Sequence, residues 1–291
     1  MGVRPRRKVV LMGPTSLSSK EREKTRADKA GADYWNRLWE TGKLPPPIDP
    51  YAHGVRGYYL RQFHRYFEEA FGGRETLGLK LIEVGCAQSA YLPYFAKYFG
   101  FVVSGLDRSR IGCEKARRIL EREGVKGEVH CADLFSLSPA LNEQFDVLVS
   151  FGVIEHYPDT AECVKAMAKL LKPNGKMVTV VPNMNGVHGT MQRILDRSVY
   201  DIHVPLDREG VLSAHLRAGL VVERCDYFLP SNLGVVNFEK WRRSFLIYNL
   251  LRSLRSLLSN SFWLVDEHLV RLPASRRMSP NINCVARKPS V

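Results

Sequence analysis

The sequence predicts a doubly wound α/β fold built on a mostly parallel, seven-stranded sheet, with a helical insertion before the last strand. From residue 79 to residue 228, short apolar runs typical of buried strands alternate with amphipathic stretches of helical length. Strands that alternate with helices pair in parallel through right-handed crossovers, so we expect helices on both faces of the sheet. A last strand-like run, residues 281–288, follows an interruption at residues 229–279.

The region before the sheet divides into two predicted parts. Residues 1–32 are polar, basic and without sustained periodicity, which predicts a flexible arm. Residues 33–78 predict an N-terminal helical lid, because apolar side chains recur at helical spacing over residues 56–71 and Gly72 ends that helix. Tyr34 and Trp35 are candidate contacts to a bound substrate in this lid, although packing in the core would explain them equally well.

The remaining elements follow in regular order. The predicted strands are residues 79–84, 101–106, 125–132, 145–150, 176–181, 220–228 and 281–288. The predicted helices are residues 89–99, 109–123, 160–171 and 207–218, with a loop between the fifth strand and the helix at 207. Ser109 is a suitable N-cap residue for the helix predicted to end at residue 123. We therefore predict a ligand-binding α/β domain over residues 79–228, a helical cap over residues 229–279, and a final strand and tail over residues 280–291.

Composition narrows the class of protein. The 291 residues carry a formal net charge of +13, which favours anionic surroundings, although part of the excess lies in the basic arm. The six cysteines are scattered without a C-x-x-C pair, so neither a zinc site nor a disulfide framework is indicated. No run approaches the roughly 20 apolar residues that span a bilayer. We expect a cytoplasmic protein that at most contacts a membrane peripherally.

Loops at the carboxyl ends of successive strands carry the chemistry, because ligands of open α/β sheets bind outside those ends. Small residues after the first strand permit a tight turn, and Glu83 there can meet a cationic amine. Asp107 follows the second strand, where a carboxylate can accept the hydroxyls of a ribose. Asp133 follows the third strand and can accept an adenine amine. The fourth strand ends in Ser150-Phe-Gly-Val-Ile-Glu-His156.

With these motifs the sequence resembles the class I, Rossmann-like S-adenosylmethionine-dependent methyltransferases. The resemblance rests on Glu83-Val-Gly-Cys-Ala87, Gly105-Leu-Asp107, Ala132-Asp133, the run from Phe145 to His156, and Leu170-Leu-Lys-Pro-Asn-Gly175. It implies that S-adenosylmethionine binds and S-adenosylhomocysteine leaves. The implied cofactor contacts are Glu83, Gly85, Cys86, Ala87, Asp107, Arg108, Ala132, Asp133, Leu134, Ser150, Phe151, Gly152 and Val153.

The first loop departs from the family pattern at two positions. Ala87 and Ser89 stand where the family often has glycine, and because both are small we expect a tighter turn rather than a lost site. A dinucleotide-binding dehydrogenase is disfavoured, because the G-x-G-x-x-G spacing is absent.

The acceptor of the methyl group is less clearly indicated. His156 and His203 are candidate general bases for a hydroxyl acceptor, because both follow strands on the ligand side. A structural hydrogen bond would explain either histidine as well. The candidate acceptor contacts are Tyr34, Trp35, His188, Tyr200 and Trp241. No metal-ligand set stands out, so we expect metal-independent chemistry.

We predict O-methylation of a small-molecule or glycan- or lipid-linked acceptor. An RNA or protein methyltransferase is the alternative favoured by the charge, although no RNA-binding module is recognisable. A non-catalytic cofactor-binding scaffold is a third reading. The arginine-studded segment 229–279 fits either a peripheral membrane contact or a cap buried against the domain or a homodimer partner.

Overall fold

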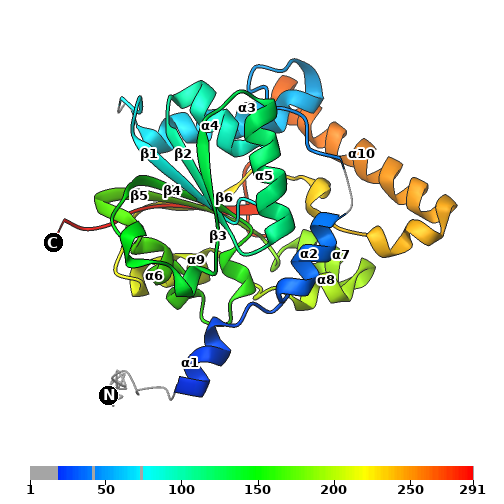
Figure 1. Ribbon diagram of the computed structural model, residues 1–291. Helices are drawn as coiled ribbons and strands as arrows, with labels where there is room; N and C mark the ends of the chain where they lie inside the picture. The colour runs from blue at the N-terminus through cyan, green and yellow to red at the C-terminus, as the bar shows by residue number, and fades with distance from the viewer. Residues whose placement is uncertain (1–18, 41–42, 73–74, 291) are drawn as a thin grey trace, which may run out of the picture.

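The computed structural model describes residues 19–40, 43–72 and 75–290, and Figure 1 shows a twisted central sheet between two layers of helices. The sheet has seven strands in the order β3-β2-β1-β4-β5-β7-β6. The strands are β1 (Lys80–Val84), β2 (Val102–Asp107), β3 (Gly127–Cys131), β4 (Phe145–Phe151), β5 (Leu171–Pro182), β6 (Val221–Phe228) and β7 (Asn281–Arg287). Strands β1 to β5 pair in parallel, whereas β7 runs antiparallel to both β5 and β6.

Helices cover both faces of the sheet, which confirms the doubly wound prediction. On one face, α3 (Gly54–Phe71), α4 (Tyr91–Phe99) and α5 (Arg110–Arg122) enclose a core rich in aromatic rings. On the other, α6 (Thr160–Ala168) and α9 (Arg208–Arg217) enclose an aliphatic core. The Ser109 hydroxyl accepts a hydrogen bond from the Gly112 N–H, so the predicted N-cap of α5 is confirmed.

Two local expectations were wrong. The segment between β5 and α9, expected as a loop, contains α7 (Val187–Leu195) and α8 (Arg197–Asp201). Met191 and Leu195 of α7 pack against the segment after β6, a long-range contact that periodicity over so short a stretch does not reveal. The helix expected to reach residue 171 ends at Ala168, because Leu171 already pairs with Phe145 as the first residue of β5.

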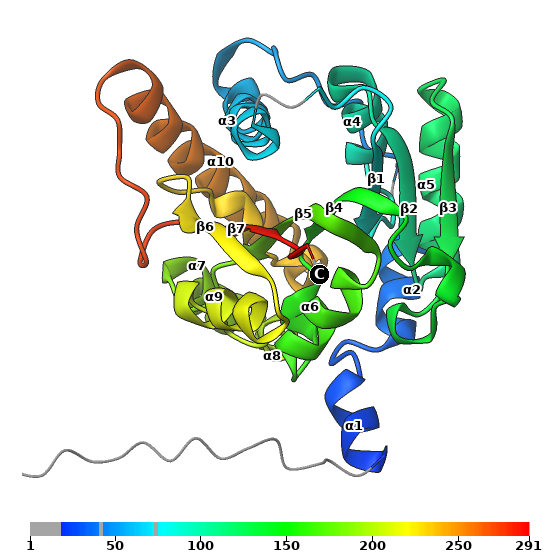
Figure 2. The same cartoon turned by 90° about the vertical axis from the view of Figure 1, so that its left-hand side faces the viewer.

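Residues 32–40 pack on α5 near the sheet edge formed by β3 (Figure 2). Residues 1–18 of the predicted arm lie outside the described residues. The part that is described contains α1 (Ser19–Arg26) and α2 (Ala32–Glu40). Contacts hold this region to the body, since Arg26 pairs with Glu162 and the Lys29 N–H donates to the His156 carbonyl. The short 3-10 helices η1 (Leu134–Ser136), η2 (Pro139–Leu141) and η3 (Ile154–His156) lie in the sheet's loops.

The segment expected as a helical cap is mainly one long helix. After η4 (Leu233–Val235) and η5 (Glu239–Arg243), α10 (Phe245–His268) packs along α3 and extends past the body of the domain (Figure 1). Among the described residues, no helix is both long enough and apolar enough to cross a membrane.

The strand order places a switch point between β1 and β4. The chain winds outward from β1 toward β3 on one side and from β4 toward β5 on the other, so the loops after these strands diverge. Such a divergence leaves a crevice beyond the carboxyl ends of the strands, where open α/β sheets bind their ligands.

Candidate active site

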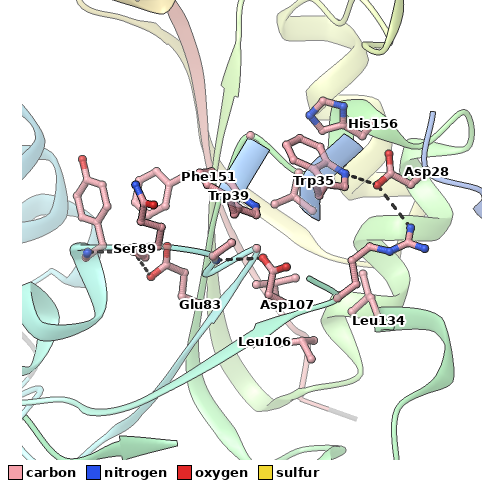
Figure 3. A pocket seen from close by; sticks show the side chains of 18 of the residues that line it. Asp28, Trp35, Trp39, Glu83, Ser89, Leu106, Asp107, Leu134, Phe151 and His156 are labelled. Atoms are coloured by element: carbon pink, nitrogen blue, oxygen red, sulfur yellow. Dashed lines mark hydrogen bonds and ion pairs between the residues drawn. The ribbon is translucent and has the colours of Figure 1, made fainter. Parts of the chain in front are cut away.

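A cavity of about 440 Å³ lies in this crevice (Figure 3). Its size falls within the roughly 300–1,000 Å³ typical of small-molecule sites. The loops after β1, β2, β3 and β4 meet helix α2 around it. The lining residues are Asp28, Trp35, Trp39, Pro45, Glu83, Val84, Gly85, Ala87, Gln88, Ser89, Ala90, Tyr91, Leu106, Asp107, Arg108, Ala132, Leu134, Phe151, Gly152, Val153, His156 and Tyr157.

The loop after β1 approaches the cavity with its backbone. Gly85 has a φ of 81°, and a Cβ placed on it would lie 2.4 Å from Val153 Cγ2, so only glycine fits here. Where the family often has a third glycine, the Ser89 hydroxyl donates to Glu83 Oε2 at 2.7 Å and accepts from the Tyr91 N–H at 2.9 Å. The turn therefore exposes backbone to the cavity while it fixes one side of the Glu83 carboxyl.

Two acidic side chains lie on neighbouring strands beside the cavity. Burial raises the pKa of Glu83 to about 8, with the Ser89 bond acting against the shift and Asp107 adding to it. Asp107 accepts the Ser109 N–H at 2.7 Å and the Ala87 N–H at 3.0 Å. Burial also raises the pKa of Asp107, and these two bonds oppose that rise. A cationic amine or a diol would compensate the desolvation of these carboxyl groups.

Most of the predicted cofactor residues meet around the cavity. Among the described residues, the lining does not include Cys86, Asp133 or Ser150. Cys86 packs behind the loop, where its Sγ would lie 2.5 Å from a Cβ on Gly105. Asp133 accepts the Phe135 N–H and so caps η1, while Ala132 and Leu134 on either side of it face the cavity.

Helix α2 and the residues before it close one side of the cavity. The Trp35 indole N–H donates to Asp28 Oδ2 at 2.6 Å, and Arg108 Nη1 lies 3.5 Å from the same oxygen. The Asp28 side chain is only 3% exposed, so the N-terminal segment contributes a buried carboxyl group to the site. Sequence reasoning missed Asp28, because it lies in the presumed arm and no local pattern marks it.

Two histidines meet on the side of the cavity next to Trp35. His156 lines the cavity, and its ring lies 4.6 Å from the ring of His203, centroid to centroid. Their Nδ1 atoms bond to the carbonyls of Ile202 (3.0 Å) and Val199 (2.6 Å), so we assign the protons to Nδ1 and leave each Nε2 as an acceptor. Burial lowers the pKa of His156, and burial together with His156 lowers that of His203 to about 4. Both imidazoles are therefore neutral at physiological pH.

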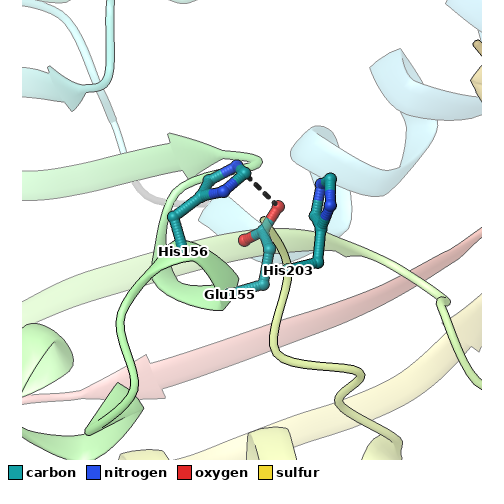
Figure 4. A group of neighbouring side chains, drawn as sticks. All are labelled: Glu155, His156 and His203. Carbon is teal, nitrogen blue, oxygen red and sulfur yellow. Dashed lines mark ion pairs between the residues drawn. The ribbon is translucent and has the colours of Figure 1, made fainter. Parts of the chain in front are cut away.

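Glu155 completes a cluster with these histidines (Figure 4). One ligand atom from each of the three side chains lies within 4.8 Å of the others, a spacing that would admit a divalent cation. Glu155 is 1% exposed, neither carboxyl oxygen has a hydrogen-bond partner among the described residues, and burial raises its pKa to about 8. A cation would therefore have to displace a proton. Sequence reasoning did not single out this carboxyl as a ligand.

The candidate acceptor residues are dispersed. Trp35 lines the cavity, and Tyr34 lies edge-on behind it with ring centroids 5.0 Å apart. Tyr200 lies on α8, next to the loop that carries His203. His188 is buried in α7, and Trp241 donates from its indole to the Leu195 carbonyl. The described residues that line the cavity do not include Tyr34, His188, Tyr200 or Trp241.

The fold and the cavity together define a Rossmann-like protein with a small-molecule pocket at its switch point. Residues 82–179 match the family model described as a methyltransferase domain. Through this segment the chain is similar to S-adenosylmethionine-dependent methyltransferases of the Rossmann-like class.

The chain is also similar in sequence to named methyltransferases. A ubiquinone biosynthesis O-methyltransferase of Rhodopseudomonas palustris (strain HaA2) is 28% identical over 176 residues, which cover 60% of this chain and 66% of the relative. The match thus spans just under two thirds of that relative's length.

Solved structures support the fold. A geranyl diphosphate C-methyltransferase from Streptomyces coelicolor, solved with Mg²⁺, geranyl diphosphate and S-adenosylhomocysteine, superposes with a TM-score of 0.55 at 14% identity, covering 88% of this chain and 96% of that one. The [4+2]-cyclase SpnF superposes with a TM-score of 0.56 at 14% identity, covering 96% and 98%. Because the second of these is named for a different reaction, the fold alone does not define the chemistry.

Proposed function

We propose that the protein transfers the methyl group of S-adenosylmethionine to a hydroxyl of a small organic acceptor, either free or linked to a glycan or lipid. The observation that carries this proposal is the meeting of Glu83, Asp107 and His156 around one cavity. The first two are buried carboxyl groups on neighbouring strands, and the third is a neutral imidazole on the loop after β4. The O-methyltransferase names of the curated relatives agree with it.

The residues present fit the cofactor. Glu83 has one oxygen bonded to Ser89 and can meet the amine of the methionine part with the other. Each oxygen of Asp107 accepts one backbone bond and retains capacity for a ribose hydroxyl. The glycine at position 85 allows the close approach of backbone to ligand, and Leu134 offers an apolar face to the adenine.

The chain's own groups then prepare the acceptor. S-adenosylmethionine supplies an electrophilic methyl carbon on a sulfonium, which the acceptor oxygen attacks in line as the carbon–sulfur bond breaks. His156 Nε2, unprotonated at neutral pH, takes the proton of the acceptor hydroxyl, while the Ile202 carbonyl holds the ring in that tautomer. Trp35 and Trp39 cover the cavity and exclude water that would compete with the acceptor.

The test is transfer of isotopically labelled methyl from S-adenosylmethionine to defined acceptor pools. Purified protein is incubated with hydroxylated aromatic compounds, polyprenyl- or lipid-linked phenols, total RNA and total protein in parallel. Label in a methyl ether of a small molecule supports the proposal. Label confined to RNA or protein contradicts the acceptor class, and S-adenosylhomocysteine binding without label in any pool favours a non-catalytic cofactor-binding protein.

A further inference from the structure

Helix α10 carries apolar side chains on its outer side as well as on its inner side. Leu251 and Leu258 face the segment after β6 and Trp263 stacks on Tyr58, whereas a second set of leucines faces outward. Leu246 is 82% exposed, Leu250 67% and Leu257 64%. A packed helix ordinarily turns its apolar side to the core and its polar side to water.

The outward leucines form one continuous face. Leu246, Leu250, Leu257 and Leu264 recur at spacings of four and seven residues, which aligns them along one side of the helix. Ser259 and Asp266 each follow one of these leucines by two residues, about 200° around the helix. The apolar line and the buried polar line therefore lie on opposite sides.

Polar bonds hold the helix in this rotation. The Ser259 hydroxyl accepts the Leu233 N–H at 3.1 Å. Asp266 accepts the Tyr58 hydroxyl, accepts the Leu272 N–H at 2.7 Å, and lies 3.3 Å from Arg271 Nη1. Turning the leucines inward would break all of these and leave a buried carboxylate without partners, which costs several kcal/mol. The outer face is thus a fixed feature of the fold.

More apolar surface lies at the start of the helix. Phe245 is 74% exposed, and on α7 Ile194 is 73% exposed. The two regions adjoin, because the Trp241 indole before α10 donates to the Leu195 carbonyl at 3.0 Å. We call Ile194, Phe245, Leu246, Leu250, Leu257 and Leu264 the outer apolar face.

Positive charge gathers at one end of this face. Lys240, Arg242 and Arg243 lie directly before Phe245 and Leu246, and no Asp or Glu occurs from residue 240 to residue 265. On the helix itself Arg255 turns inward over the Phe238 ring, and the acidic Asp266 and Glu267 come only in the last turns, where they bond to Tyr58 and Arg61. An exposed apolar helix face that begins beside a basic cluster suits the headgroup region of an anionic bilayer.

We propose that the outer apolar face docks the protein on an anionic lipid surface, with α10 lying in the plane of the headgroups. The leucines enter the acyl boundary, and Lys240, Arg242 and Arg243 before the helix lie at the level of the lipid phosphates. The proposal goes beyond methyl transfer and does not depend on it, since a protein inactive on every acceptor would still bind lipid in this way.

The experiment is vesicle flotation with the full chain. Vesicles contain phosphatidylcholine alone or phosphatidylcholine mixed with phosphatidylglycerol, at low and at high salt. We expect binding only to the anionic vesicles, and weaker binding at high salt because the charges are screened. Leu246→Ser combined with Leu250→Ser and Leu257→Ser should weaken binding at least about 10-fold.

Matched variants separate docking from general surface effects. Leu216→Ser removes a 54% exposed leucine from α9 and should leave binding unchanged. Arg243→Gln, beside Phe245, should weaken binding about fivefold, whereas Arg110→Gln on α5 should leave it unchanged. The melting temperature of each variant should match that of the wild type, because all of these side chains are exposed.

Two results would overturn the proposal. One is the absence of binding to anionic vesicles at low salt, or binding that survives the triple leucine substitution. The other is a wild-type dimer in solution that the same substitution converts to a monomer, because the face would then be an interface between copies of this chain.

Discussion

The ring of Trp35 stands edge-on against the imidazole of His156, with ring centroids 4.9 Å apart and planes at 83°. This contact joins helix α2, from the N-terminal part of the chain, to the loop after β4 at the centre of the sheet. The bond from Trp35 to Asp28 and the bond from the Lys29 N–H to the His156 carbonyl strengthen the same junction. The candidate active site is therefore completed by residues far from the sheet in sequence.

Removing Trp35 should loosen this side of the cavity. In Trp35→Ala we expect the affinity for S-adenosylhomocysteine to fall about 10-fold or more, because a large aromatic contact area and the bond to Asp28 are both lost. Calorimetric titration measures the effect. Trp241→Ala is the matched control, since Trp241 lies outside the cavity lining among the described residues. Equal losses in the two variants would mean that Trp35 acts only through overall stability.

Asp107 should dominate recognition of the ribose. Asp107→Ala removes charge-assisted hydrogen bonds of about 1.5–3 kcal/mol, so we expect roughly 10- to 100-fold weaker binding of S-adenosylhomocysteine in the same titration. Asp146→Ala is the control, because Asp146 is the second residue of β4, at the end of the sheet opposite the cavity, and pairs with Lys172. Unchanged affinity in Asp107→Ala would remove the ribose contact from the proposed site.

His156 should act as the general base. We expect His156→Gln to lower kcat by a factor of about 10² or more with a small change in KM. In the wild type, kcat should rise with pH and level off below pH 6.5, because burial lowers the pKa of His156 and the base must be unprotonated. His203→Gln tests the neighbour in the same assay. If both variants keep turnover within a few-fold, general-base catalysis by either histidine is excluded.

The buried glutamates should make the cofactor-free protein less stable as the pH rises. The folded-state pKa values of Glu83 and Glu155 are about 8, well above the ordinary value of 4.5, so between these values the folded state holds protons that the unfolded state has lost. Stability must then fall with increasing pH. The window from pH 7.5 to 8 separates this effect from that of the buried histidines, which are largely neutral there in both states.

Urea denaturation at several pH values within this window measures the slope. We expect Glu155→Gln to flatten it, since the amide does not ionise. Glu128→Gln, at an exposed position on β3, should leave the slope unchanged. A wild-type stability that stays level or increases across the window contradicts the raised pKa values.

Removing metal ions should not stop methyl transfer at neutral pH. Glu155 is protonated there, so the cluster with His156 and His203 offers three neutral ligands and a cation would have to displace a proton. We expect full activity after dialysis against a chelator. Loss of activity that a divalent cation restores in the wild type, but not in Glu155→Gln, would instead identify these side chains as its ligands.

The hydrophobic periodicity predicted the order of strands and helices, and the acidic residues after the strands predicted part of the site. Alternating strand and helix patterns predicted all seven strands to within two residues at most ends, because buried parallel strands are short, apolar and bounded by turns. The first residue of β5 was the exception. Glu83 and Asp107 were found because the topology of such a sheet brings the carboxyl ends of neighbouring strands together.

Only the tertiary structure decided the rest. Asp28 enters the site through contacts that span 80 residues to Arg108, and Glu155 joins His203 across the loop after β5. A local sequence pattern does not predict contacts between residues so far apart in the sequence. The rotation of α10 was hidden for the same reason, since its apolar residues occur on both sides and only the bonds of Ser259 and Asp266 show which side faces the body. Local sequence sets the period of an element, but long-range polar bonds set which side of it faces the core.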